Sequence, residues 1–442
     1  MKAILATIIA ASLTVGCGMI EGEQTTTDSG GSTTDTGGSD TGGASTPVVS
    51  CNATFQNGWP QQFGSCSNDD GKDVAVDNSG NVYIVGTTSG EIDSHSNLGG
   101  SDVFVVKYDS LGNKQWSRQF GDSNSNSGKY VDLDSSGNIY VFGATGNVPF
   151  ITKLNNAGTE EWTVNTPEAT YGYSTGIAVD QTNGDIYITG MDYDTTFDGQ
   201  TSNGNYDAYI VKYNNSGNKQ WSRLYGGNLG DISYGIATDS SGGVYITGYK
   251  YVSVGNKQFY IAKYDTSGSF LWDSTFPSGE GNSISVGVYG NIYVTGETTG
   301  TIESDQSNAG GYDIFVAKYN SSGSRLWTEM IGGNKNDFPH SLETGLNEEV
   351  YITGYTFGDL QSYSSQHSGD VVTIKYNMNG YLQWVNQADS QAGGREEGNG
   401  IAVDQTGNVY ITGQTSGGLD NNTNAGGNDV FVIKYDSSGN QL

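Results

Sequence analysis

The sequence predicts an all-β protein, a closed seven-bladed β-propeller built from four-stranded antiparallel blades. Tryptophan recurs seven times, at intervals of 46 to 59 residues, and each interval carries the same four short apolar segments. The 442 residues include 67 glycines and 29 tyrosines but only 6 prolines, a composition typical of strands joined by tight turns. Because no long apolar segment has a helical period, we expect almost no helix. The recurring residues are Trp59, Trp116, Trp162, Trp221, Trp272, Trp327 and Trp384.

Each interval divides into four predicted strands. The last one contains segments 400–404, 408–413 and 429–436, and complete intervals add a fourth segment such as 218–223. All are apolar or alternating over four to eight residues, as strands are. The turns between strands carry an Asp-x-x-Gly-Asn pattern, as at 77–81 and 109–113. Asp accepts hydrogen bonds from the backbone ahead of it, and Gly supplies the positive φ of a tight hairpin.

The two ends of the repeat region predict how the ring closes. The chain stops at residue 442, one residue before the next expected tryptophan, and segment 58–64 near the N-terminus matches 116–121. The N-terminal strand should therefore complete the last blade, which removes the exposed edges of the ring. Cys51 and Cys66 bracket this strand, and in an exported protein we expect them to pair as a disulfide. Two free thiols are the alternative.

The first 17 residues indicate export. Lys2 precedes a short apolar run, 3–15, that is too short to span a bilayer and is typical of a signal peptide. Residues 14–17 resemble a bacterial lipobox, although Thr14 stands where Leu is usual, and the resemblance implies that Cys17 is lipidated. The alternative is ordinary cleavage that removes Cys17. The location implied is the cell envelope, as an outer-membrane or cell-surface lipoprotein.

Two further segments complete the predicted domain organisation. Residues 18–50 consist mostly of Gly, Ser, Thr and Asp, which cannot bury a core, and so form a disordered linker. Residues 51–442 form the propeller.

The repeated motif resembles a known family. Gly-Ile-Ala-Val-Asp at 400–404, Asn-Val-Tyr-Ile-Thr-Gly at 408–413 and Asp-Val-Phe-Val-Ile-Lys-Tyr-Asp at 429–436 are similar to the bacterial SBBP-type β-propeller repeat. The resemblance covers residues 57–442. It implies a secreted or surface propeller, often in large or lipid-anchored proteins, with no general activity. The Asp-x-x-Gly-x-x-x-Trp step is more distantly similar to quinoprotein-type propellers, with one residue fewer.

The formal net charge of −29 restricts the partners. Such a surface repels phosphate backbones, so we expect no nucleic acid partner and membrane contact only through the lipid anchor. Proteins, glycans and cations remain open, and the acidity could also serve solubility alone. Nothing in the sequence implies an oligomer.

The sequence offers no convergent catalytic set, so we expect no enzyme. The histidines, His95, His340 and His367, form no His-x-x-x-His pair and lack the spacing of a zinc site. We expect no cofactor. Calcium is the one ion left open, because oxygen ligands are abundant although no EF-hand loop occurs.

Asp132 and Glu343 break a column of small residues on the first strand, near the expected central channel. They could form a remote acid pair, a cation site or solvated channel residues. The acid pair would support the alternative function of a carbohydrate-active hydrolase or lyase.

A lysine recurs at the same position of the third strand in every repeat, and we call this set the lysine column. We interpret it as structural, because a residue present in every blade usually packs between blades. The column comprises Lys107, Lys153, Lys212, Lys263, Lys318, Lys375 and Lys434.

The predicted binding face is the rim that carries two kinds of loop: the second join of each blade, which connects its second and third strands, and the link from one blade to the next. These loops are long and irregular. Exposed aromatic residues there suit protein or glycan contacts, unless they cover their own loops. The leading hypothesis is a binding or scaffolding module for macromolecules, and a third possibility is a periplasmic assembly scaffold. The candidate contacts are Tyr171, Tyr173, Tyr193, Phe197, Phe338, His340, Phe357 and Tyr363.

Overall fold

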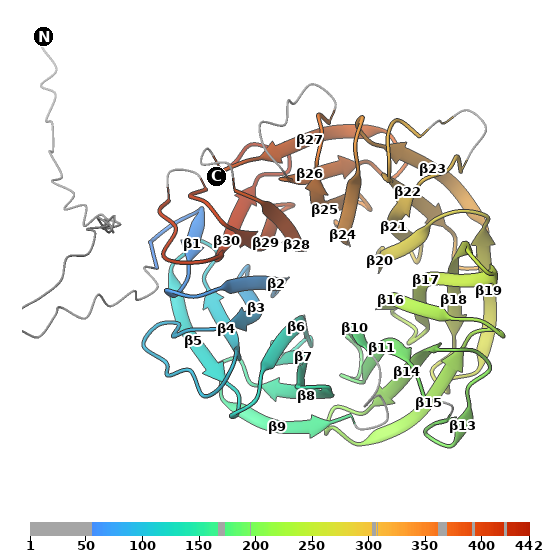
Figure 1. Ribbon diagram of the computed structural model, residues 1–442, viewed down its shortest axis with the longest axis horizontal. Helices are drawn as coiled ribbons and strands as arrows, with labels where there is room; N and C mark the ends of the chain where they lie inside the picture. The colour runs from blue at the N-terminus through green and yellow to red at the C-terminus, as the bar shows by residue number, and fades with distance from the viewer. Residues whose placement is uncertain are drawn as a thin grey trace, which may run out of the picture. The chain divides into compact units, whose positions relative to one another are not determined.

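The computed structural model describes residues 55–166, 173–194, 196–302, 306, 308–360, 369–390, 394–419 and 422–442. Within them, seven four-stranded antiparallel sheets form a ring, which confirms the predicted seven-bladed β-propeller (Figure 1). This part of the chain contains no α-helix, and hence none long and apolar enough to cross a membrane. The predicted signal peptide and linker lie outside the described residues.

In every blade the first strand lines the centre and the fourth lies at the outer edge (Figure 1). The first strands are β2 (Asp69–Val76), β6 (Asn126–Leu133), β10 (Tyr173–Val179), β16 (Asp231–Thr238), β20 (Glu280–Val286), β24 (Asp337–Thr344) and β28 (Glu396–Val403). The second strands are β3 (Val82–Thr88), β7 (Ile139–Thr145), β11 (Ile186–Asp192), β17 (Val244–Ser253), β21 (Ile292–Thr298), β25 (Val350–Thr356) and β29 (Val409–Thr415).

The outer half of each blade repeats the same order. The third strands are β4 (Asp102–Tyr108), β8 (Val148–Leu154), β14 (Asp207–Tyr213), β18 (Asn256–Tyr264), β22 (Asp313–Tyr319), β26 (Asp370–Tyr376) and β30 (Asp429–Tyr435). The fourth strands are β5 (Lys114–Phe120), β9 (Glu160–Asn165), β15 (Lys219–Tyr225), β19 (Phe270–Phe276), β23 (Arg325–Ile331), β27 (Leu382–Ala388) and β1 (Gln61–Phe63). A short extra hairpin, β12 (Thr196–Phe197) with β13 (Gln200–Thr201), lies in the third blade.

The two ends of the propeller region meet in one blade, as the repeat count predicts. Strand β1 pairs antiparallel with β30, with Gln62 opposite Phe431, and completes the sheet β1-β30-β29-β28. Phe63 is buried in a core that joins this last blade to the first. The edge of β30 is therefore covered by a strand from the other end of the chain.

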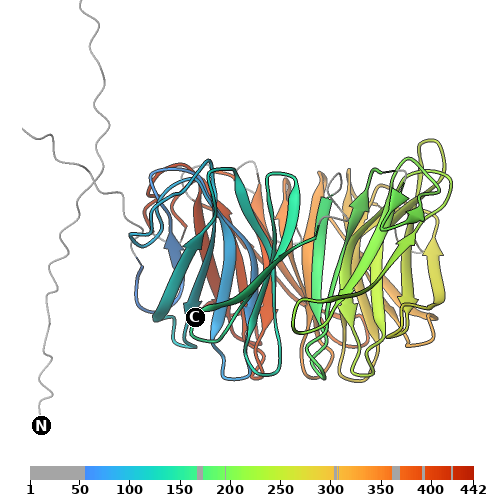
Figure 2. The same cartoon turned by 90° about the horizontal axis from the view of Figure 1, so that it is seen from below.

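The Asp-x-x-Gly-Asn turns form as predicted. In the first blade Asp77 Oδ1 accepts hydrogen bonds from the amides of Ser79 and Asn81, both at 2.9 Å. Gly80 has a φ of 79°, a left-handed conformation that glycine adopts at little cost. These turns lie on one face of the ring, and the second joins and blade links lie on the opposite face, because the strands run between the two faces (Figure 2).

The apolar core is divided among the interfaces between neighbouring blades. Seven clusters of buried side chains each combine residues of two adjacent blades. Phe259 of the fourth blade, for example, packs on Phe315 of the fifth with ring centroids 5.5 Å apart. A blade shares its apolar faces with both neighbours, so the core is complete only when the ring is closed.

The tryptophan and lysine columns form a clamp between blades. At the closing interface, Trp59 Nε1 and Lys434 Nζ both donate to the carbonyl oxygen of Ser110 in the next blade, at 3.2 and 3.1 Å. The same double donation occurs at four further interfaces, where the accepting carbonyls belong to Asn156, Thr266, Met378 and Ser437.

Six lysines of the column are buried and Lys263 is half-buried, and all seven place the ammonium group over a tyrosine ring of the second strand. The structural interpretation of this column is therefore correct.

Replacing Trp59 with alanine should lower the free energy of unfolding by about 3 kcal/mol, because the ring contacts with Tyr108 and Tyr410 and the bond to Ser110 are lost together. Urea denaturation measures this loss. Tyr381→Ala, at a side chain that is 69% exposed in an outer turn, is the control and should change stability by less than about 0.5 kcal/mol. A Trp59→Ala effect as small as the control would contradict the closure.

Candidate functional site

The centre of the ring holds a cavity of about 1030 Å³, lined by first-strand residues from all seven blades and by several first-join turns. A hollow of this size matches or exceeds the range typical of small-molecule sites. Because the lining extends from the middle of the first strands to the Asp-x-x-Gly turns, the cavity reaches toward the tight-turn face rather than the predicted long-loop rim.

Every first strand contains one β-bulge, and the bulged residue faces the cavity. The register between first and second strands slips by one residue at equivalent places in all seven blades. Bulges are common beside active sites, where they redirect a side chain. The bulged residues are Lys72, Lys129, Thr175, Tyr234, Asn282, His340 and Asn399, and all of them line the cavity. We call them the bulge ring.

Three members of the bulge ring hold the next blade. Asn399 Nδ2 donates to the Gly71 carbonyl at 2.8 Å, and Thr175 Oγ1 donates to the Ser233 carbonyl at 2.6 Å. His340 Nδ1 lies 3.1 Å from the Gly398 carbonyl, so this nitrogen must carry the proton. Burial lowers the pKa of His340, which favours the neutral imidazole.

Two lysines of the bulge ring stand on adjacent blades. Lys72 forms an ion pair with Asp70. Lys129 forms no ion pair with any of the described residues, and its pKa is lowered by burial and by the charge of Lys72. The cavity therefore offers one cationic group that is free to meet a ligand.

Asp132 and Glu343 both lie on the cavity wall, where a third carboxylate, Asp73, joins them. Asp132 Oδ2 accepts a hydrogen bond from the Val179 amide of the next blade at 2.7 Å. Asp73 Oδ2 accepts from the Val131 amide in the same way at 2.9 Å.

These carboxyl groups are far less acidic than usual. Burial raises the pKa of Asp73 and that of Asp132 to about 7; the charges of Asp132 and Glu343 add to the shift of Asp73, and those of Glu343 and Asp134 add to the shift of Asp132. Burial also raises the pKa of Glu343. Near neutral pH Asp73 and Asp132 can therefore hold a proton, which a hydrogen-bonding ligand could share.

The described rim aromatics gather in two groups. Tyr173 and Tyr193 are 54% and 46% exposed, with ring centroids 6.1 Å apart. Phe338 and Phe357 are half-buried and pack around Tyr355, with which His340 is also in contact.

Phe197 must be removed from the predicted binding face. Its side chain is fully buried and stacks on Tyr209, with centroids 5.1 Å apart, so it cannot meet a partner. It packs the short β12–β13 hairpin onto its own blade. Tyr171 and Tyr363 lie outside the described residues, as do Cys17 and Cys51. The Cys51–Cys66 pairing therefore stays a prediction.

The sequence reasoning missed the bulge ring: it placed His340 on the long-loop rim, whereas His340 lines the central cavity. One signal could have found the ring: its position carries five residue types in seven repeats and directly follows a position that is Gly or Ser in six of the seven.

The chain carries SBBP-type repeats. The SBBP description, "Beta-propeller repeat", matches residues 58–93, 115–151, 220–249 and 391–420. The chain is 26% identical over 277 residues to an uncharacterized WD repeat-containing protein, L264, of Acanthamoeba polyphaga mimivirus, covering 54% of this chain. It is 25% identical over 206 residues to the regulatory protein FlaEY of Caulobacter vibrioides, covering 40% of this chain. It spans 18% and 21% of the length of these two relatives.

Similar solved structures are also propeller-like. One is a Dos1 propeller, with a TM-score of 0.46 and 11% identity over 88% of this chain and 96% of that chain. Another is YCF48 bound to D1 peptide, with a TM-score of 0.45 and 12% identity over 86% of this chain and 96% of that chain. A third is a luciferin-regenerating enzyme, with a TM-score of 0.40 and 15% identity over 72% of this chain and 96% of that chain.

The buried carboxylates predict that stability increases as the pH falls from 8 to 5. Burial holds the folded-state pKa of these groups at about 6 or 7, above the unfolded value of 3.8, so the folded protein binds more protons in this range. One group shifted by two units contributes up to about 2.7 kcal/mol, so the groups together should give a gain of at least about 3 kcal/mol. The groups are Asp69, Asp73, Asp132, Asp231 and Asp337.

Below that range the trend should reverse. Burial alone would raise the pKa of Asp239, but hydrogen bonds led by those from Ser241 and Tyr245 outweigh it and lower the pKa to about 2. Its contribution is present above the unfolded value and is lost as the pH falls toward 2. Urea denaturation at fixed ionic strength should therefore find a maximum near pH 5. Maximal stability at pH 8 would show that the buried carboxylates are not destabilising when charged.

Proposed function

We propose that this propeller of SBBP-type repeats is a binding module whose ligand site is the central cavity. The observation that carries the proposal is the bulge ring: seven residues that escape the repeat, all directed into one hollow. In a repeat protein, positions common to every blade serve the architecture, so the positions that differ are the ones available for recognition.

The chemistry of the cavity favours a polar ligand, and we propose a short oligosaccharide. Tyr130 and Tyr234 offer aromatic faces with polar tips, while Asn282 and Asn399 offer amides and Lys129 an ammonium group. This combination of flat apolar surface and many hydrogen-bonding groups suits a sugar chain better than an apolar small molecule.

We further propose that the protein is exported and held at the cell envelope through lipidation of Cys17. The support is the signal-like segment 1–17, its lipobox-like end and the linker 18–50, which would hold the propeller away from the membrane. The exposed aromatics Tyr173 and Tyr193 on the long-loop rim would then provide a second surface, for macromolecular partners.

A catalytic role for Asp132 with Glu343, as in a hydrolase or lyase, is the second candidate. The observation in its favour is the raised pKa of both half-buried carboxyl groups, about 7 for Asp132, since an acid protonated near neutral pH can protonate a leaving group. Against it, both oxygens of Asp132 already accept backbone hydrogen bonds, from Leu133 and Val179. These two hydrogen bonds are sufficient to explain why Asp132 is present, so ligand binding remains the leading proposal.

The cavity site predicts that Tyr234→Ala weakens oligosaccharide binding at least ten-fold. The fluorescently labelled propeller would first be applied to a glycan array, and the tightest oligosaccharide measured by isothermal titration calorimetry. Tyr381→Ala, an exposed tyrosine outside the cavity, is the matched control and should bind like the wild type.

Two results would overturn this proposal: no oligosaccharide binds, or Tyr234→Ala binds as tightly as the control. Cleavage of the bound oligosaccharide that disappears in Asp132→Asn would instead favour the enzyme.

Lipidation predicts that Cys17→Ala releases the protein from membranes. Expressed in a bacterial host with labelled palmitate, the wild type should carry the label and sediment with membranes, whereas Cys17→Ala should do neither. The acyl chain supplies the membrane affinity, so its loss should move nearly all the protein to the soluble fraction. An unlabelled wild type would exclude the anchor and leave the binding proposal standing.

A further inference from the structure

The junctions between blades repeat a buried pair of polar side chains. At five junctions the first residue of the third strand lies near the first residue of the next blade's first strand, and both are buried. Four of the pairs consist of two carboxylates. The pairs are Asp102 with Asn126, Asp207 with Asp231, Asp313 with Asp337, Asp370 with Glu396, and Asp429 with Asp69.

At four of these five junctions, all but the one between the sixth and seventh blades, a glycine follows the fourth strand and fills the space beside the pair. A Cβ atom at Gly226 would stand 2.6 Å from both Asp207 Oδ1 and Asp231 Oδ2, and one at Gly64 would stand 2.3 Å from Asp429 Oδ1. The loop then supplies a donor, since the Gly227 amide donates to Asp231 Oδ2 at 2.6 Å. Backbone therefore fills the space at these junctions, although one carboxylate oxygen each of Asp102, Asp207, Asp231, Asp313 and Asp429 has no hydrogen-bond partner among the described residues.

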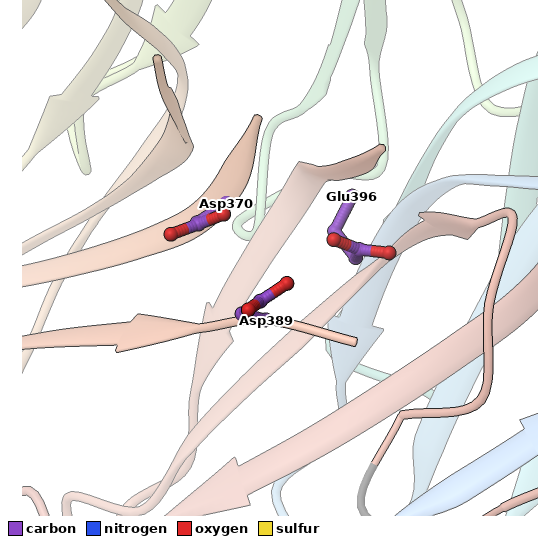
Figure 3. A group of neighbouring side chains, drawn as sticks. All are labelled: Asp370, Asp389 and Glu396. Atoms are coloured by element: carbon purple, nitrogen blue, oxygen red, sulfur yellow. The ribbon is translucent and has the colours of Figure 1, made fainter. Parts of the chain in front are cut away.

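The junction between the sixth and seventh blades departs from this arrangement. Asp389 stands where the others have glycine, and Glu396 stands where they have Asp or Asn. Oxygen atoms of Asp370, Asp389 and Glu396 lie within 4.8 Å of one another, and Figure 3 shows the three carboxyl groups converging from β26, the end of β27 and β28.

A second observation indicates that a ligand is missing here. Glu396 is fully buried, and its Oε1 accepts a hydrogen bond from Thr415 Oγ1 at 3.2 Å, but its Oε2 has no partner among the described residues. The Ser390 hydroxyl, also fully buried, makes no hydrogen bond of regular geometry, but it and the Ser390 amide lie close enough to Glu396 to oppose the effect of burial on the pKa of Glu396. An orphaned carboxylate oxygen in a buried site is costly unless a cation or a donor reaches it.

Further oxygen atoms surround the same space. A Cβ atom at Gly394 would stand 2.7 Å from Glu396 Oε1, 2.7 Å from Ser416 Oγ and 2.9 Å from Ser390 Oγ. Glycine therefore keeps open a small cradle lined by oxygen. Burial raises the pKa of Glu396, and the charge of Asp389 raises it further, so the carboxylates repel one another.

The donor set and the spacing indicate which cation fits. Only oxygen ligands are offered, which selects a hard cation. Calcium binds oxygen at about 2.3 to 2.6 Å, so two ligands on opposite sides of the ion lie up to about 5 Å apart, which accommodates the 4.8 Å limit of this cluster. Magnesium demands near-ideal octahedral geometry and usually keeps several waters, so a site walled by protein oxygens suits calcium better.

We propose that Asp370, Asp389 and Glu396 form a calcium site that joins the sixth and seventh blades. The ion would neutralise the three converging carboxylates and use the oxygen of Glu396 that is otherwise without a partner. This site is separate from the central cavity and does not depend on the ligand proposed there.

Asp389→Gly tests the site with a natural control, because it restores the residue found at the other junctions. Thermal unfolding of the full propeller would be followed in EDTA, in CaCl2 and in MgCl2, and calcium binding measured by isothermal titration calorimetry. We expect one calcium per wild-type chain and a rise in Tm of roughly 4 °C at saturating CaCl2, with a smaller rise in MgCl2. Asp389→Gly should fold, bind no calcium and show no rise.

Asp389→Asn serves as a second variant that keeps the size of the side chain and should bind calcium at least ten-fold more weakly. Asp122→Asn, at an exposed acid beside another junction, controls for general charge and should retain the full rise. A wild-type Tm that does not respond to calcium would overturn the proposal. So would a rise that persists in both Asp389 variants.

Discussion

The structure depends on the clamp between neighbouring blades. A tryptophan ring and a lysine ammonium group from one blade donate to a single carbonyl oxygen in the next, as Trp327 and Lys318 do to Met378, at 3.2 and 3.1 Å. The lysine also lies over a tyrosine of its own blade, with Nζ 4.9 Å from the ring centroid of Tyr293. The contact combines a charge-assisted hydrogen bond, an indole donor and a cation–π interaction at one point. Because each blade buries its apolar faces only against its neighbours, the ring depends on contacts of this kind, and among the described residues the double donation occurs at five interfaces.

The closed ring has a direct consequence for function. It fixes seven first strands side by side, so that the same position of every blade faces one cavity (Figure 1). The bulge adds one residue to each strand and turns it toward the centre, where the side chain no longer serves the sheet. Seven repeats of one architecture thereby present seven side chains of five types, lysine, threonine, tyrosine, asparagine and histidine, to a common ligand. Recognition can change at these positions while the blades stay the same.

Most of the fold was predictable from the sequence, because the repeat is regular. The tryptophan count, the turn chemistry and the matching ends specified seven blades and the role of the Trp59 strand. The departures were harder. Asp132 and Glu343 were visible because they interrupt a position that is otherwise occupied by small residues, but Asp73 was not recognised. A bulge shifts the alternation of side chains along the strand by one residue, so the alternating pattern does not reveal it. Phe197 looked exposed because a loop of its length gives no sign that it folds back onto its own blade.

Contacts between blades explain the remaining failures. Glu348 is fully buried in the sixth blade and accepts a hydrogen bond from Tyr293 of the fifth at 2.8 Å, replacing a turn aspartate that the fifth blade lacks. Nothing in the spacing of either repeat reveals that exchange. Asp389 received no role from the sequence, and only the folded chain brings it to Asp370 and Glu396.

Backbone hydrogen exchange with and without the bound oligosaccharide tests the central claim most directly. If the bulge ring is the site, ligand should slow exchange in the first strands of several blades, including the amides around Lys129, Tyr234 and Asn399 in β6, β16 and β28. Protection confined to the long-loop rim around Tyr173 and Tyr193, with the first strands unchanged, would contradict a site in the central cavity.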